Sequence, residues 1–216
     1  MILVPVKNLS NAKQRLASLL DQPTRTELAQ AMLLDVLSVL SNWASCPEVG
    51  IVTNDSHAMN LAAKFGFEVI QDSNISETAA IELATQICES RGVESTLVIP
   101  GDIPLINPAE LDQIMNAAPA QGSVLVPAAD GRGTNAAFRR PAGLFPLRFG
   151  NDSFKPHRAA AEATGLLCAI ISLQGIALDI DNPSDLQELA AAPGQTHSQQ
   201  LVRQWNLADF PVAAGE

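Results

Sequence analysis

The chain has 216 residues, of which 47% are hydrophobic and 17% charged, proportions that are typical of one globular domain rather than of a disordered chain. Its formal net charge of −10 argues against nucleic-acid binding, because phosphate backbones require a broad basic face. The first apolar stretch ends at Lys7, too early for a signal peptide or membrane span, and the three cysteines lie far apart. We therefore expect a cytoplasmic protein with reduced thiols and no membrane partner.

Runs of β-favouring residues alternate with amphipathic segments along most of the chain. Strands are predicted at 2–6, 49–53, 67–70, 96–99, 123–126, 134–138 and 166–180, the last interrupted around Gln174 and Gly175. Helices are predicted at 24–43, 57–65, 77–88, 109–117, 153–163 and 184–191. The alternation implies right-handed crossovers and a mainly parallel sheet with helices on both faces, to which the second half adds antiparallel strands.

One α/β domain is thus expected over residues 1–193. Residues 194–216 form a polar tail with a short helix around 201–207. Trp205 of this tail would dock either on the core of the same chain or on a second subunit, in which case the protein is a homodimer.

The segment 96–105, TLVIPGDIPL, brings one carboxylate to the end of a buried strand. The apolar run stops at Pro100 and Gly101, and Asp102 follows. Open α/β sheets bind ligands at the carboxyl edge of their strands, where a carboxylate often holds a metal. Asp102 is therefore a candidate metal ligand. The alternative is that it caps the turn or the helix that begins near Pro108.

The first predicted strand runs into a loop that carries Lys7, Lys13 and Arg15. Such a loop can wrap nucleotide phosphates with backbone amides and cations. The chain has neither GxGxxG nor GxxxxGK[ST], which argues against dinucleotide dehydrogenases and P-loop NTPases. Alternatively, Lys13 and Arg15 lie on the exposed face of a short helix.

The segment LDIDNPSDL places Asp179 and Asp181 on one face of a predicted strand, with Ile180 on the other. Together with Asp102 these acids could bind Mg²⁺, with substrate phosphates as the remaining ligands. Asp179 is the preferred ligand of the two, since Asp181 can also be read as a turn or cap residue.

Two further segments, GRGTNAAF and FGNDSFKPHR, combine glycines with the hydroxyls of Thr134 and Ser153 and with a helix that begins near Ser153. They predict a second anion site. Read otherwise, GRG is a hairpin turn and Asp152 or Ser153 an ordinary helix cap. His157 fits a packing role as well as a ligand role.

Positive charge is concentrated in two windows, which indicates a pocket for a small polyanion if the windows meet and two solvated faces if they do not. Nine of the 13 lysines and arginines lie in these windows, namely Lys7, Lys13, Arg15, Arg132, Arg139, Arg140, Arg148, Lys155 and Arg158.

The ordered combination of LVPVKxLxxAKxRL, VIPGDIPL, GRGTNAxF, FGxxSFxxHxxxA and LDIDxPxDL resembles the 2-phospho-L-lactate guanylyltransferase family of coenzyme F420 biosynthesis, which also includes phosphoenolpyruvate guanylyltransferases. The resemblance spans residues 1–189. It implies a Rossmann-like nucleotidyltransferase domain of the glycosyltransferase-A type. It also implies transfer of GMP from GTP to a three-carbon phospho-acid (2-phospho-L-lactate, phosphoenolpyruvate or 3-phosphoglycerate), with release of pyrophosphate.

The resemblance also implies roles for individual residues. Mg²⁺ would be bound by Asp102, Asp179 and Asp181, and the acceptor by Thr134, Gly150 and Ser153. GTP would be bound by Lys7, Lys13, Arg15, Pro100 and Gly101, with Asp102, Lys13 and Arg15 acting in catalysis.

One segment departs from the family pattern, which has a Gly-rich stretch and a Leu-Asn pair before the middle helix. This chain reads DSNISETAAIELA there, with Thr78 near the expected Asn, and this region is expected to help select the base. Two alternatives stay open: a nucleotidyltransferase of the same fold with a molybdopterin or sugar-phosphate acceptor, and a non-catalytic nucleotide-binding protein.

Overall fold

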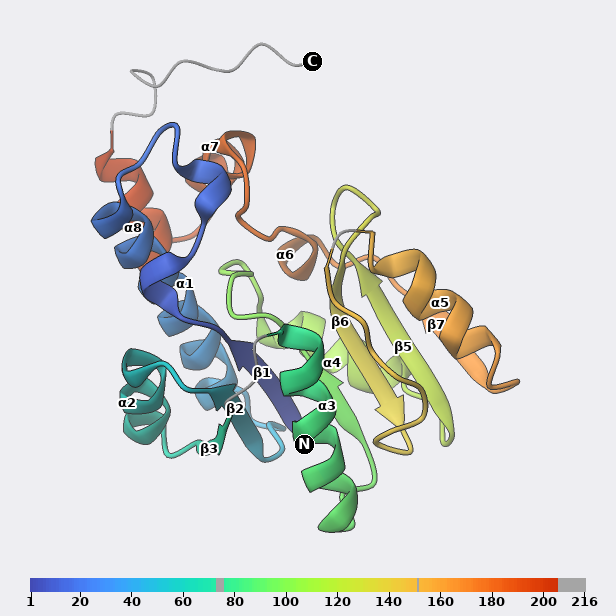
Figure 1. The fold of residues 1–216 in the computed structure, drawn as a ribbon. Coiled ribbons are helices and arrows are strands. Elements are labelled where there is room, and N and C mark those ends of the chain that lie inside the picture. Colours follow the sequence, from blue (N-terminus) through green and yellow to red (C-terminus); the bar gives the residue numbers. More distant parts are fainter. Residues whose placement is uncertain (73–75, 151, 206–216) are drawn as a thin grey trace.

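A computed structural model describes residues 1–72, 76–150 and 152–205. Its centre is a seven-stranded sheet of order β3-β2-β1-β4-β6-β5-β7 (Figure 1). Strands β1 to β4 are parallel, β6 runs antiparallel to β4 and β5, and β7 is parallel to β5. The strands are β1 Ile2–Val6, β2 Val49–Thr53, β3 Glu68–Gln71, β4 Thr96–Val98, β5 Gly122–Pro127, β6 Thr134–Arg140 and β7 Leu167–Ile170.

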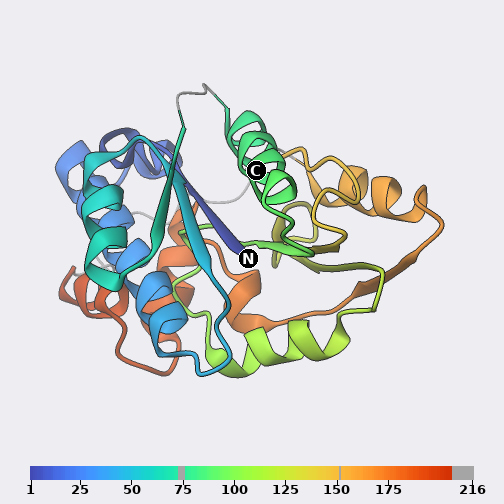
Figure 2. The same ribbon diagram turned by 90° about the horizontal axis from the view of Figure 1, so that it is seen from below.

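Eight α-helices and two short 3₁₀ helices are described around this sheet. They are η1 Leu9–Asn11, η2 Gln14–Leu16, α1 Gln22–Asn42, α2 Ser56–Phe65, α3 Glu77–Ser90, α4 Pro108–Ala117, α5 Phe154–Glu162, α6 Gln174–Ala177, α7 Pro183–Ala191 and α8 His197–Gln204. Figure 2 shows α3 and α5 on one side of the sheet and α1 and α4 on the other. The predicted α/β fold with a mainly parallel mixed sheet is confirmed, and boundaries agree within two residues for most elements.

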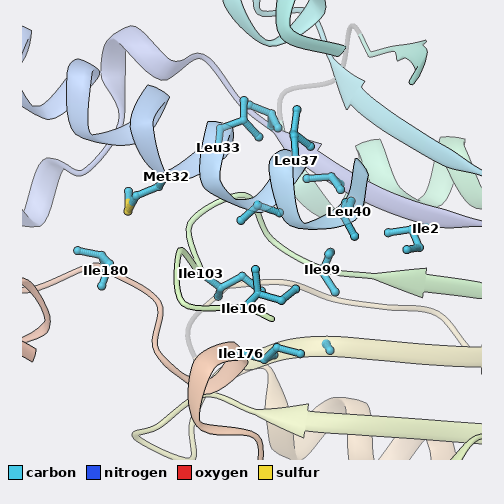
Figure 3. Packing of buried hydrophobic residues seen from close by; sticks show 14 of the residues in the cluster. Ile2, Met32, Leu33, Leu37, Leu40, Ile99, Ile103, Ile106, Ile176 and Ile180 are labelled. Atoms are coloured by element: carbon cyan, nitrogen blue, oxygen red, sulfur yellow. The ribbon is translucent and has the colours of Figure 1, made fainter. Parts of the chain in front are cut away.

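The helices cover both faces because the central strands are apolar on both sides. On β1, Ile2 and Val4 pack into the larger hydrophobic cluster with α1, whereas Leu3 packs into the smaller one with α3. In the larger cluster, Leu33 and Leu37 of α1 lie opposite Ile99 (Figure 3). This packing fixes the chain directly after β4.

The prediction of a strand over 166–180 is wrong beyond Ile170. Residues 174–177 instead form the one-turn helix α6, and residues 178–181 belong to no strand. The amide of Gly175 donates to Glu110 Oε1 at 2.7 Å, and a Cβ at Gly175 would lie 2.2 Å from the carbonyl oxygen of Leu105. The chain leaves the sheet here because it packs closely on the loop that contains Leu105.

The C-terminal helix begins earlier than predicted, at His197 rather than near residue 201, and Leu207 lies outside the described residues. Asp35 of α1 accepts hydrogen bonds from the amides of His197 and Ser198, at 2.7 and 2.9 Å. Trp205 packs against the larger cluster of the same chain, as in the first of its two alternatives.

The three cysteines are free thiols, in agreement with expectation. Within residues 1–72, 76–150 and 152–205, none of the helices has the length and apolarity needed to span a bilayer.

Candidate active site

The loops after β1 and β4 and the segment 178–182 gather at one end of the sheet (Figure 1). At their centre lies the ammonium group of Lys13. Its Nζ lies 2.5 Å from Asp102 Oδ2 and 3.0 Å from Asp181 Oδ1. Arg15 adds a contact of 2.9 Å from Nη1 to Asp181 Oδ2. Residues separated by up to 168 positions therefore form one charged cluster, and the predicted convergence of Asp102 with the LDID segment is confirmed.

Lys13 does not lie on the exposed face of a helix, so that alternative is wrong for it. The residue precedes η2 with a left-handed backbone, φ 56°, and only 6% of its side chain is exposed. Burial alone would lower its pKa, but Asp102 and Asp181 outweigh burial and raise the pKa above its ordinary value. Lys13 is thus a buried, permanently charged cation. Arg15, with 58% of its side chain exposed, does lie at the surface.

Asp102 is held by the loop that follows β4. Ile99 and Ile103 on either side of it are fully buried in the larger cluster (Figure 3). The carbonyl oxygen of Asp102 accepts a hydrogen bond from the amide of Ile180 at 3.2 Å, which ties this loop to the segment with the other two acids. The predicted position of Asp102 beyond the carboxyl end of a strand is confirmed.

Asp179 and Asp181 alternate with the buried Ile180 as predicted, although they lie in an irregular segment and not in a strand. Asp179 Oδ1 accepts a hydrogen bond from Asn135 Nδ2 at 3.0 Å. Burial raises the pKa of Asp179, the bond from Asn135 opposes this, and the charges of Asp102 and Asp181 add to the increase. The fixed alternation around a core residue directs both carboxylates to one cavity.

Two cavities meet at this cluster. The first, of about 540 Å³, has an apolar floor of Ala29, Met32 and Leu33 and is also lined by Lys7 and Gly101. The second, of about 480 Å³, is lined mainly by polar groups, among them Thr134, Asn135, Gly150, Ser153 and Asp179. Five residues line both cavities, namely Arg15, Glu77, Pro100, Asp102 and Asp181. The predicted GTP-binding residues therefore border the first cavity and the predicted acceptor-binding residues the second.

Glu77 is a residue of this junction that the sequence analysis did not single out. It is the first residue of α3 and is partly buried between the two cavities. Burial and the charge of Asp102 raise its pKa to about 7, against opposing effects of Lys7 and Lys13. Its only sequence signal was an acid in the first turn of a helix, which is common wherever helices begin.

Neutral donors also line the second cavity. Thr134 Oγ1 lies 2.9 Å from Nδ1 of the buried His157, and Ser153 is the N-cap residue of α5. Gly150 has φ 134°, a conformation that L side chains rarely adopt, and a Cβ there would have no atom within 4 Å. The glycine is therefore required by the backbone and not by crowding.

Thr78 lies in the segment that departs from the family pattern, and it holds the loop that contains Gly150. Its Oγ1 accepts a hydrogen bond from the amide of Phe149 at 3.0 Å. Residues 73–75 of the departing segment lie outside the described residues.

The two basic windows meet only in part. Arg132 lines the second cavity together with Arg15, and it forms an exposed ion pair with Asp152. Arg139, in contrast, is buried and donates to the carbonyl oxygen of Phe145 and to the hydroxyls of two threonines, so its role is structural. The prediction of one polyanion pocket is therefore wrong for Arg139.

Comparison with known proteins gives one family. The family model described as "Guanylyl transferase CofC like" matches residues 1–212. A phosphoenolpyruvate guanylyltransferase of Sphaerobacter thermophilus is 35% identical over 87% of this chain and 90% of its own length. A 3-phospho-D-glycerate guanylyltransferase of Colwellia psychrerythraea is 30% identical over 88% of this chain and 90% of its own length. A 2-phospho-L-lactate guanylyltransferase of Methanothermobacter thermautotrophicus is 28% identical over 97% of this chain and 92% of its own length.

The fold is also found in a crystal structure from Desulfovibrio desulfuricans G20, provisionally titled a nucleotide-diphospho-sugar transferase. The TM-score is 0.78 at 17% identity, with 94% of this chain and 93% of the other covered. At that identity the likeness shows the fold alone.

Proposed function

Because the chain belongs to the CofC-like guanylyl transferase family, we propose that it transfers GMP from GTP to a three-carbon phospho-acid and releases pyrophosphate. The observation that carries this proposal is the pair of cavities with a shared charged wall. A transferase for two polyanionic substrates needs two adjacent sites with cations where they meet. Arg15 lines both cavities, and Lys13 lines the first and contacts Asp102 and Asp181 of the shared wall.

GTP is assigned to the first cavity. Lys7, Lys13 and Arg15 supply charge for the triphosphate, and the apolar floor of Ala29, Met32 and Leu33 suits a nucleoside. The acceptor is assigned to the second cavity, where hydroxyl groups and the N-terminus of α5 can bind a carboxylate or phosphate. The names of the relatives make phosphoenolpyruvate, 2-phospho-L-lactate and 3-phosphoglycerate the acceptors to test.

In the proposed reaction, a phosphate oxygen of the acceptor attacks the α-phosphorus of GTP. A new P–O bond forms in line with the bond that breaks, and pyrophosphate leaves. A phosphate monoester is largely dianionic near neutral pH, with a second pKa of about 6, so no side chain has to remove a proton. The work of the protein is to hold two polyanions together and to stabilise the charge that develops on the leaving group.

Mg²⁺ is part of the proposal. Asp102 and Asp181 are close enough for one cation, the ammonium of Lys13, to contact both, and carboxylate oxygens are ligands that Mg²⁺ prefers. Among the described residues, no three acidic, His or Cys side chains are already arranged around a metal position. Asp102 and Asp181 would hold the ion, with Asp179 as a further candidate and with substrate phosphates supplying other ligands. When bound, Mg²⁺ neutralises charge on the phosphates.

The decisive experiment is to incubate the protein with Mg²⁺, each nucleoside triphosphate in turn and each of the three acids, and to identify products by mass. The expected result is a guanylylated acid and one equivalent of pyrophosphate. A product from another nucleotide or a sugar phosphate would indicate a different transferase of the same fold, and GTP binding without pyrophosphate release would indicate a non-catalytic protein. We place the enzyme in coenzyme F420 biosynthesis, as its family resemblance implies, and in the cytoplasm, because its free thiols fit a reducing compartment.

A further inference from the structure

The hydrogen bonds of His157 determine the direction of the hydrogen bond to Thr134. The imidazole is 1% exposed, and its ring meets that of Phe149 edge to face with centroids 5.2 Å apart. The amide of Arg148 donates to Nε2 at 2.7 Å. A backbone amide can only donate, so Nε2 carries no proton, and the neutral ring carries its proton on Nδ1.

His157 stays neutral at physiological pH. Burial lowers its pKa to about 4, the charge of Arg139 contributes to the decrease, and the bond from Arg148 partly opposes it. Protonation would also place a second N–H opposite the amide of Arg148. The ring is therefore held in one tautomer by its surroundings.

The consequence falls on Thr134. Nδ1–H of His157 donates to Thr134 Oγ1 at 2.9 Å, which occupies a lone pair of the hydroxyl. A hydroxyl has one proton to donate. Within the described parts of the chain, the bond to His157 is the one hydrogen bond of the Thr134 side chain. Thr134 is only 5% exposed and lines the second cavity, so its proton is left for a ligand there.

We propose that His157 is a positioning residue that makes Thr134 a hydrogen-bond donor to an oxyanion of the acceptor. Ionised carboxylate and phosphate oxygens accept hydrogen bonds, so a threonine whose proton is kept available for donation favours an anion. His157 acts through Thr134 and touches no substrate itself. This inference rests on the proposed function, because the oxyanion is taken to belong to the acceptor.

The first test needs no substrate. Long-range ¹⁵N–¹H correlation spectra of the labelled protein report the tautomer of each histidine. His157 should show the neutral form with its proton on Nδ1 throughout pH 6 to 8, whereas His197, which is largely exposed, serves as the internal comparison. A proton on Nε2, or titration of His157 near pH 6.5, overturns the proposal. The result is independent of whether the protein transfers GMP.

The second test uses kinetics of a double-mutant cycle. Thr134→Val should raise the KM for the acceptor about tenfold, the size of a hydrogen bond to a charged group, with kcat and the KM for GTP within about twofold of wild type. His157→Gln can still reach the amide of Arg148 but not Thr134, and should raise the same KM to a similar extent. The double variant should resemble Thr134→Val alone. Additive effects, or equal effects on both substrates, would mean a merely structural role.

Two conservative variants guard against misfolding as the explanation. Thr134→Ser keeps the hydroxyl and should bind the acceptor nearly as wild type does. His157→Asn keeps a donor toward Thr134 and should recover part of the affinity lost in His157→Gln. His197→Gln, a histidine that contacts Asp35 far from the cavities, is the matched control and should leave the acceptor KM unchanged. Failure of Thr134→Ser to bind the acceptor in a folded protein contradicts the proposal.

Two inhibitors can identify which group of the acceptor supplies the oxyanion, its carboxylate or its phosphate. Pyruvate carries the carboxylate without the phosphate, and ethyl phosphate carries the phosphate without the carboxylate. The inhibitor whose Ki rises in Thr134→Val identifies the group that Thr134 contacts. If neither Ki changes, Thr134 is not a donor to the acceptor and the proposal falls. If the wild-type protein yields no guanylylated product but shows the Nδ1–H tautomer, the proposed function has failed and the orientation of Thr134 stands.

Discussion

The two cavities share a wall but present different means of binding an anion. The first offers full charges on side chains, and Lys13 is already neutralised there by Asp102 and Asp181. The second is also lined by Arg15 and Arg132, and it adds neutral donors, of which Thr134 is oriented by a hydrogen bond with His157. Charges paired with acids must exchange partners when a substrate enters, whereas oriented neutral groups need no rearrangement. Changes at the shared wall should therefore affect both substrates, and changes to the neutral donors only one.

The largest effect is expected for Asp102→Asn. The substitution keeps the size of the side chain but removes a charge that faces both cavities, so the rate of pyrophosphate release should fall about 10³-fold or more. Circular dichroism and thermal unfolding should show a folded protein. Glu188→Gln, an exposed acid on α7, is the matched control. Wild-type turnover in folded Asp102→Asn would refute the assignment of the site.

Lys13→Met should separate the two roles of that side chain. Loss of a phosphate-binding cation should raise the KM for GTP about 10²-fold. In the absence of nucleotide the same variant should bind Mn²⁺ about tenfold more tightly, because Asp102 and Asp181 are then left without their buried cation. Titration calorimetry and electron paramagnetic resonance measure the two affinities. Lys64→Met, on the exposed side of α2, should change neither.

Glu77→Gln tests the charge at the junction through stability. The folded state raises the pKa of Glu77 to about 7, above its ordinary value, so its contribution to stability is full below pH 4.5 and is lost as the pH rises through 7. Glutamine has no charge to bury. In metal-free buffer the variant should be about 2 kcal/mol more stable than wild type at pH 8 and equal to it near pH 4. Urea unfolding at both pH values measures this, and Glu82→Gln, exposed on the same helix, should show no such dependence.

Ile180→Val is expected to have the smallest effect. Removing one buried methyl group should lower the free energy of unfolding by about 1 kcal/mol. Because the residue lies between Asp179 and Asp181, turnover should fall as well, by several-fold, whereas Ile170→Val on the exposed side of β7 should change neither property. An unchanged turnover would mean that the two carboxylates are positioned independently of the core.

Much of the fold was accessible from the sequence because local patterns and tertiary structure agree. The alternation of buried strands and amphipathic helices up to β4 determined the parallel half of the sheet. It failed at residues 171–180, where the apolar composition suits a strand but the amide of Gly175 bonds Glu110 from a distant helix. A contact between residues so far apart leaves no periodic signal.

The site was predictable where a residue type is tied to a strand end. Asp102 was found for that reason, whereas the LDID segment was found through the alternation of its acids with Ile180, although it is not a strand. The two meet as expected. The burial of Lys13 was not predictable, since it depends on which side of an irregular loop faces inward. The junction position of Glu77 was not predictable either, since it depends on where the first turn of α3 lies relative to the two cavities. The structural use of Arg139 was likewise hidden, because nothing in its mainly basic window of sequence distinguishes it from the other arginines.

The wall that both cavities share has a thermodynamic consequence. If binding of GTP displaces Lys13 from Asp181, the acceptor meets an altered electrostatic potential, and its dissociation constant changes by some factor. Reciprocity then requires that the acceptor change the dissociation constant of GTP by the same factor. The two binding equilibria are linked through five side chains, so neither affinity is a fixed property of its own cavity.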